Sequence, residues 1–465
     1  MEISEIRSLE PRLNQFLHNF DDCFVDDRTR SHLRTYVQGQ LSDLPRKSVE
    51  PIALRANTPP RTLQEFLSLL RWDEGLMRDR LEEHVARKHP SEHSVGVIDD
   101  TGCPKKGNKT PGVQSQWCGA SGKVDNCIVT VHLSYAADAF HCLLDGELFL
   151  PESWNKDRQR CRKAGIPDSM VYRPKWKIAL ELYDKAIANG VRLHWLTFDQ
   201  WYTNKPGFLH ELTQRQQYYV GDAPELMSGW IDEPPAVTRR PYRRSVYGRP
   251  RKTPRLLART KRCQSIAWHL LHSEAFQNQA WTPYRIREGT QGPMVWEAKH
   301  AFFYPKGDDG LPLNRHHLIV ARNVLNPKEL KYFISNAPEQ TTLETLLLVG
   351  FTRWTVERCF EDEKMELGFD HFEGRHYQGL KRHQCITAVS HLFLAETKID
   401  LTKKKSRDNV EPTPFGFKLP DSIVVAWAGC GSETDAEGIK SNQAISKEQC
   451  QITEKSPTKN TKKTA

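Results

Sequence analysis

Two short apolar runs that each end in aspartate constrain the fold of this chain most strongly. One run closes on Asp99 and Asp100, and the other closes on Asp199 about a hundred residues later. Short runs rich in Val, Ile, Leu and aromatic residues are typical of buried strands. Residues 151–189 lie between them and carry a helical pattern that ends on Asn-Gly. Strands and helices that alternate in this way predict an α/β sheet, with carboxylates at the strand ends where a sheet meets its ligands.

A helical stretch farther along the chain supplies a third acid. Residues 349–375 space their apolar side chains at helical intervals. A neighbouring face carries charged residues three or four positions apart, namely Arg353, Glu357, Glu361 and Lys364. A carboxylate bordered by an arginine and a lysine suits a site that holds metal ions against phosphate.

These motifs, in this order, resemble those of the DDE-type transposases of bacterial insertion sequences. In one branch of that family the third acid lies in an R-x3-E-x6-K signature, which Arg353, Glu357 and Lys364 match. A tyrosine usually precedes the arginine by three positions, and Gly350 stands there in this chain. The resemblance spans roughly residues 63–396 and includes the segments IDDTGCPKKG, LTFDQWY and YFISNAP. It implies an α/β fold in which a ribonuclease-H-like catalytic domain is interrupted by a mainly β insertion and preceded by a helical N-terminal domain.

The resemblance and the changes in sequence pattern together predict five regions. The N-terminal region is a candidate for recognition of DNA ends. Near the end of the catalytic domain, Lys381, Arg382 and His383 are expected on a helix face exposed toward DNA. The predicted regions are the helical N-terminal domain (1–90), the first part of the catalytic domain (91–204), the mainly β insertion (205–345), the second part of the catalytic domain (346–400) and a mobile C-terminal tail (401–465).

The resemblance implies that three acids hold two Mg2+ ions, with Mn2+ able to substitute. Asp99 is predicted to bridge both ions, while Asp199 and Glu357 each complete the coordination of one. Two such ions activate the attacking water or 3′-hydroxyl and stabilise the leaving oxygen of a phosphodiester. Asp100 is the alternative to Asp99, and Glu361 is the alternative to Glu357. Strand alternation and the family pattern favour Asp99, and the signature spacing favours Glu357.

Basic residues predict contacts with DNA phosphates. The net charge of +9 favours an anionic partner. Arg353 and Lys364 are predicted to clamp phosphates beside the metals, and Lys105 and Lys106 lie in a loop after the first acid. Residues 238–262 hold eleven basic residues and no acid. Phosphate contacts are predicted there from Arg239, Arg240, Arg243, Arg244, Arg249, Arg251 and Lys252. The alternative for the loop with Lys105 and Lys106 is a solvated turn, and the alternative for residues 238–262 is a disordered loop.

Cysteine usage and hydropathy restrict the cellular setting. The eleven cysteines include no C-x-x-C pair, which argues against a zinc ribbon or a disulfide scaffold and favours reduced thiols. The N-terminus lacks the apolar core of a signal peptide. No segment reaches the roughly 20 apolar residues that span a bilayer. We expect a protein without a membrane partner in the bacterial cytoplasm, associated with the nucleoid.

The expected function is transposition of a mobile DNA element. The protein would bind the ends of the element, cleave them and transfer their 3′-hydroxyls to target DNA. Its partner would be double-stranded DNA, both element ends and target, and pairing of two ends favours a homodimer on DNA. Two alternatives remain: a catalytically inactive DNA-binding protein on the same fold, and a host DNA nuclease that cuts without joining.

Overall fold

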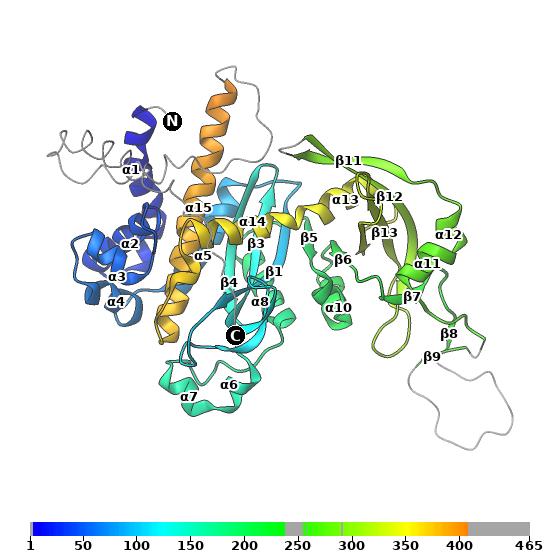
Figure 1. The fold of residues 1–465 in the computed structure, drawn as a ribbon, viewed down its shortest axis with the longest axis horizontal. Helices are drawn as coiled ribbons and strands as arrows, with labels where there is room; N and C mark the ends of the chain where they lie inside the picture. Colours follow the sequence, from blue (N-terminus) through cyan, green and yellow to red (C-terminus); the bar gives the residue numbers. More distant parts are fainter. Residues whose placement is uncertain (1–2, 238–253, 258, 290–291, 408–465) are drawn as a thin grey trace, which may run out of the picture.

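The computed structural model describes residues 3–237, 254–257, 259–289 and 292–407 of the 465-residue chain (Figure 1). The basic residues predicted at positions 239–252, from Arg239 to Lys252, lie outside the described residues, as does the tail from 408 onward. The fold is mixed α/β, with one large mixed sheet and helices against it. This agrees with the α/β class that the alternating sequence pattern predicts.

The N-terminal part is helical, as the spacing of its apolar residues predicts. Leu13, Phe16 and Phe20 are buried in the main core. Asp26 and Asp73 accept hydrogen bonds from backbone N–H groups in the first turns of α2 and α5, and these caps fix where the two helices begin. The elements are α1 (Ile3–Leu17), η1 (His18–Cys23), α2 (Asp27–Gln40), α3 (Val49–Arg55), α4 (Pro60–Ser68) and α5 (Glu74–Lys88).

The sheet has twelve strands, with β1, β5 and β6 parallel at its centre. Its path runs β10-β7-β12-β13-β14-β6-β5-β1-β3-β2, while β4 pairs with β3 and β11 pairs with β12. The strands are β1 (Val95–Pro104), β2 (Gln114–Cys118), β3 (Lys123–Ala137), β4 (Phe140–Leu148), β5 (Trp195–Phe198), β6 (Tyr219–Asp222), β7 (Ser228–Trp230), β10 (Gln264–Ser265), β11 (Thr282–Gly289), β12 (Gly292–Pro305), β13 (His316–Asn323) and β14 (Leu330–Ser335). A separate pair is formed by β8 (Ala236–Val237) and β9 (Arg255–Leu256).

The strands expected in an insertion continue the central sheet through β6 and β14. The β14 strand pairs antiparallel with β6, so hydrogen bonding runs without interruption from the central strands to β13 and β12. The boundaries of an inserted domain, 205 and 345, remain a prediction.

Helices on the sheet complete the architecture. Figure 1 shows α13 and α14 crossing the middle of the molecule, with α15 between the N-terminal helices and the sheet. The remaining helices are α6 (Glu152–Lys156), α7 (Arg158–Lys163), α8 (Lys175–Ala188), α9 (Gln200–Thr203), α10 (Pro206–Gln214), α11 (Ile266–His272), α12 (Glu274–Gln277), α13 (Leu343–Thr352), α14 (Trp354–Met365), η2 (Phe369–His371) and α15 (Tyr377–Arg407). In the part of the chain that the structure describes, none of them combines the length and apolar character that a membrane span needs.

The expectation that α15 exposes Lys381, Arg382 and His383 toward DNA is wrong for the last two, while Lys381 is half-buried and forms an ion pair with Glu74 at 3.6 Å. Arg382 is 3% exposed, and its guanidinium lies over the ring of Trp72. It donates hydrogen bonds to the backbone carbonyls of Phe66 and Trp72, among others. His383 is fully buried, because α15 packs against α2, α4 and α5. These basic side chains therefore hold the helical layer together.

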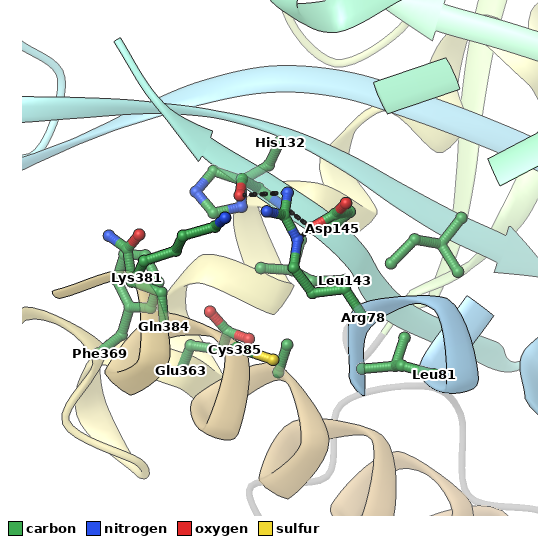
Figure 2. A pocket seen from close by; sticks show the side chains of 13 residues that line it. Arg78, Leu81, His132, Leu143, Asp145, Glu363, Phe369, Lys381, Gln384 and Cys385 are labelled. Atoms are coloured by element: carbon green, nitrogen blue, oxygen red, sulfur yellow. Dashed lines mark hydrogen bonds and ion pairs between the residues drawn. The ribbon is translucent and has the colours of Figure 1, made fainter. Parts of the chain in front are cut away.

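A buried ion pair joins the helical layer to the sheet. Figure 2 shows Arg78 reaching from α5 to Asp145 on β4, beside a small cavity. Lys185 on α8 donates to the other oxygen of the same carboxylate, Oδ2, at 3.1 Å. Arg78 also donates to the carbonyl of Gly146 at 3.0 Å. The three elements are thus tied together at one carboxylate.

Candidate active site

Strand register brings two of the predicted acids together. β1 and β5 are parallel neighbours, with Ile98 opposite Phe198, so the next residues, Asp99 and Asp199, stand side by side at the carboxyl ends of the strands. In an open sheet this edge is where ligands bind. Asp199 also caps α9, and its Oδ1 accepts from the backbone N–H of Trp201 at 3.0 Å.

A third strand-end acid, Asp222, was not singled out by the sequence analysis. It ends β6, which runs parallel to β5 with Gly221 opposite Phe198. Its segment, Tyr219–Asp222, repeats the plan of a short apolar run closed by an acid. That signal was present in the sequence, but a run of four residues inside a region assigned to an insertion carries little weight alone.

Arg353 is the centre of the acidic group. Its Nε donates to Asp222 Oδ2 at 3.0 Å, and its Nη1 donates to Asp99 Oδ2 at 3.2 Å. Its Nη2 donates to Glu357 Oε1 at 2.9 Å. The arginine stands between α13 and α14, so the helix that carries Glu357 is held against the strand-end acids. One guanidinium therefore donates hydrogen bonds to three carboxylates.

The acids are short of positive charge. Burial raises the pKa of Asp99 to about 8, Arg353 opposes this shift, and the neighbouring Asp199 and Asp100 add to it. Burial also raises the pKa of Asp199, against the hydrogen bonds from the backbone of Tyr202 and Trp201. Burial raises the pKa of Asp222 as well, with Arg353 as the main opposing group. Several perturbed acids at one sheet edge mark a candidate functional site.

The two alternative acids have other partners. Asp100 accepts from Lys175 Nζ on α8 at 2.7 Å. Glu361 forms an ion pair with Arg358 at 2.9 Å. Glu357 shares Arg353 with Asp99, and Glu361 has no contact of that kind among the described residues. The choice of Asp99 and Glu357 as catalytic residues remains a prediction that this geometry favours.

The predicted lysines occupy three different settings. Lys364 Nζ donates to Thr101 Oγ1 at 2.6 Å and to the carbonyl of Gly102 at 3.1 Å, so it lies along β1 just beyond Asp99. Lys105 Nζ donates to the carbonyls of Asp370 and Phe372, and burial lowers its pKa. Lys106 is exposed. Lys105 therefore ties the loop to the segment around η2, and its contact with phosphate stays a prediction.

The chemistry of the donor set fits a divalent cation. Among the described residues, no three His, Cys, Asp or Glu side chains are placed to hold one metal ion together. Carboxylate oxygens are nevertheless the ligands that Mg2+ prefers. Within the same described ranges, Asp199 Oδ2 receives no hydrogen bond, while Oδ1 caps α9. Since Arg353 offsets only part of the negative charge around Asp99, a cation at this edge would relieve the remaining repulsion.

Comparison with known proteins places this chain in a family. The chain is 28% identical over 193 residues to the probable transposase for insertion sequence element IS701 of Microchaete diplosiphon. That match covers 41% of this chain and 47% of the relative, so the chain spans about half the length of the curated relative it matches. The family model of the DDE superfamily endonucleases matches residues 19–293, a range that contains Asp99, Asp199 and Asp222 and ends before Glu357. The match covers more than half of the sequence, and the chain belongs to the DDE superfamily endonucleases.

Proposed function

We propose that this protein is a transposase that cleaves the ends of a mobile DNA element and joins their 3′-hydroxyls to target DNA. The observation that carries the proposal is that Asp99 and Asp199 lie side by side at the carboxyl edge of the parallel strands while Arg353 donates to both Asp99 and Glu357. Family membership supports a nuclease, and the relative named as a probable transposase supports the joining step. The proposal includes a ribonuclease-H-like catalytic domain built on β1 to β6 and α14, interrupted between Asp199 and Glu357.

The acids would hold two Mg2+ ions, or Mn2+ in their place. Asp99 would contact both ions, and Asp199 and Glu357 one each. Bound there, the ions would supply an activated water or 3′-hydroxyl and stabilise the leaving oxygen. Without them, Arg353 holds Asp99 and Glu357 close despite their mutual repulsion. Its planar guanidinium also suits bidentate contact with phosphate, so we assign Arg353 a second role in positioning DNA.

The remaining parts of the proposal concern partners and setting. Double-stranded DNA fits the net charge of +9 and the exposed lysines near β1. We propose a homodimer on paired element ends, in the bacterial cytoplasm and close to the nucleoid. The N-terminal helices, tied to β4 through Arg78, are proposed to contact the end sequence.

The test compares Glu357→Gln with Glu361→Gln, which changes a similarly exposed acid one helical turn away. Cleavage and joining are measured on DNA that carries the repeats flanking the gene, with Mg2+ or Mn2+. Loss of a metal ligand removes several kcal/mol of transition-state stabilisation, so Glu357→Gln should fall about a thousandfold or more. Glu361→Gln should stay within about threefold of wild type, as expected for a surface ion pair.

Three results would overturn the proposal. If wild type binds the ends but never cuts with either metal, the protein is a DNA-binding platform and not an enzyme. If it cuts without joining, the nuclease alternative holds. If Glu357→Gln and Glu361→Gln lose activity equally, Glu357 is not the third acid.

A further inference from the structure

A two-stranded ribbon carries an apolar pair that the rest of the described fold does not cover. β2 pairs antiparallel with the start of β3, and the register sets Trp117 opposite Val124. Trp117 is 64% exposed and Val124 is 62% exposed. Side chains that are directly opposite each other lie on the same face of a ribbon and touch. A tryptophan and a valine fixed together in solvent form a small, rigid contact surface.

The pair lies on the same face of the sheet as Asp99. Along β3, every second side chain from Val124 to His132 points to one face, and the register has no shift in this stretch. His132 is opposite Asp99 on β1. Nearer the acid, α14 and η2 cover this face, since the rings of Phe360 and Phe369 pack on His132. The ribbon continues the same face of the sheet beyond the part that α14 and η2 cover.

The distance along the strand matches a short length of duplex. About eight residues of β3 separate the partner of Asp99 from Val124, which at a rise of roughly 3.3 Å per residue is about 26 Å. Successive base pairs of DNA are roughly 3.4 Å apart, so this corresponds to about eight base pairs. A duplex that passes from the acids over α14 and η2, in the direction of β3, would therefore reach the ribbon.

The charge around the ribbon is complementary to that duplex. Lys106 and Lys109 are exposed, and neither forms an ion pair with a described residue. The loop that carries them is fixed in place: Asn126 Nδ2 donates to the carbonyls of Lys105 at 2.6 Å and Gly107 at 2.8 Å. Arg160 holds the same loop through the carbonyl of Asn108 at 2.7 Å.

The negative charge of Asp125, an acid within the ribbon, does not lie on this surface. Asp125 lies next to Val124 in the strand, so its side chain points to the opposite face. Its Oδ1 accepts from the backbone N–H of Asn126. Lys123, the other neighbour of Val124, also points to the opposite face, so the face with Trp117 and Val124 presents an apolar pair with the lysine loop beside it.

We propose that this ribbon, residues 114–127 with the lysine loop 105–112, binds the DNA duplex about eight base pairs from the bond that the active site cuts. Trp117 and Val124 enter a groove against the bases, and Lys106 and Lys109 contact phosphates. A two-stranded ribbon fits the major groove, and apolar side chains serve as wedges at base steps. The inference rests on the proposed function, because the duplex is the one that the acids act on.

Binding of the full-length protein to a fluorescent duplex of the element end tests the ribbon, with EDTA present so that nothing is cut. Aromatic contacts with bases are strong enough that Trp117→Ala should raise Kd about tenfold. Trp117→Phe should stay within about threefold, because an aromatic ring remains. Lys109→Ala should lower the salt dependence of log Kd by about 0.9 per decade of salt. The matched control is Leu325→Ala, which removes a side chain that is 94% exposed between β13 and β14.

Footprinting on the same duplex locates the contact. Wild type should protect a segment about eight base pairs from the cleavage site, and Trp117→Ala should lose protection there alone. The inference is overturned if Trp117→Ala binds as wild type does, or if the variant changes only the association state of the protein without DNA.

The outcomes also distinguish failure of the ribbon proposal from failure of the transposase proposal. Wild type that cuts normally while Trp117→Ala binds normally refutes the ribbon and leaves the transposase. Wild type that never cuts, with binding weakened by Trp117→Ala, refutes the transposase and leaves the ribbon. Wild type that binds no DNA refutes both.

Discussion

Two buried charge clusters in this molecule have opposite electrostatic balance. Around Asp145, Arg78 and Lys185 approach the same carboxylate from two helices. Burial alone would raise the pKa of Asp145, but these two cations outweigh it and the pKa is lowered. Around Asp99, Arg353 is shared among several acids, and burial raises the pKa of Asp99 to about 8. The same kind of residue is held as a stable anion at the buried Asp145 and as a poorly compensated acid at Asp99, whose side chain is 15% exposed.

The difference separates a structural cluster from a candidate catalytic one. The cluster at Asp145 joins α5, α8 and β4, and its excess acid, Glu82, accepts from Asn189 Nδ2 at 2.6 Å. Burial and the neighbouring Asp145 raise the pKa of Glu82 to about 8, so it can remain neutral inside the fold. The cluster at Asp99 lies at the edge of the sheet, where a cation from solvent can supply the missing charge. Charge balance, more than burial, therefore distinguishes the two.

The largest expected effect is on the free energy of unfolding, when the ion pairs of Asp145 are removed. Asp145→Ala leaves Arg78 buried without its main partner, and such a loss costs about 3–5 kcal/mol of unfolding free energy. Urea denaturation measures it. The control is Asp184→Ala, which removes a half-exposed partner of Arg215 and should cost less than about 1 kcal/mol. Equal losses in the two variants would show that the buried cluster does not hold the layers together.

A smaller effect should follow when a cation binds the acids around Asp99. Mg2+ that binds the folded protein stabilises it by about 2.7 kcal/mol at a hundred times Kd. The thermal midpoint of wild type should therefore rise when Mg2+ replaces EDTA. Asp99→Asn and Asp199→Asn should lose most of this rise, while Lys185→Met should keep it, because its site is the other cluster. A full response in Asp199→Asn would place the cation elsewhere.

Much of the fold follows from local sequence pattern. Apolar runs between turn residues predict most of the strands, and the apolar spacing of Leu13, Phe16 and Phe20 predicts a buried helix face. The joining of β6 to β14 could not be predicted in this way. It depends on hydrogen bonds between residues about 110 positions apart, such as Asp222 with Phe333, and local patterns carry no information about such pairing.

The candidate site could likewise be predicted only in part from the sequence. The order of acids and the helical spacing indicate Asp99, Asp199 and Glu357, because chemistry restricts which residues can occupy such positions. The environment of basic residues is set by packing, which sequence does not display. Arg382 donates to backbone carbonyls in the interior, and Lys105 does so in a loop. A positive charge in the sequence thus predicts a DNA contact only where the fold leaves it exposed, as it does for Lys106.

The effect of pH, which is the smallest of the three when taken per pH unit, separates the two clusters by sign. The pKa of Asp99 is about 8 in the fold and 3.8 when unperturbed. The stability linked to this group is therefore fully present below pH 3.8 and is lost as pH rises toward 8. The slope is at most about 1.4 kcal/mol per pH unit. For Asp145, whose pKa is lowered, stability is present above the usual pKa and is lost as pH falls.

Urea denaturation in EDTA measures the free energy of unfolding of each variant against pH. Between pH 5 and pH 8 the unfolding free energy of Asp99→Asn should rise relative to that of wild type, and the difference should be constant above that range. Asp184→Ala should show no such trend. A difference between Asp99→Asn and wild type that does not change with pH would mean that Arg353 alone balances the acids, and the contrast between the clusters would disappear.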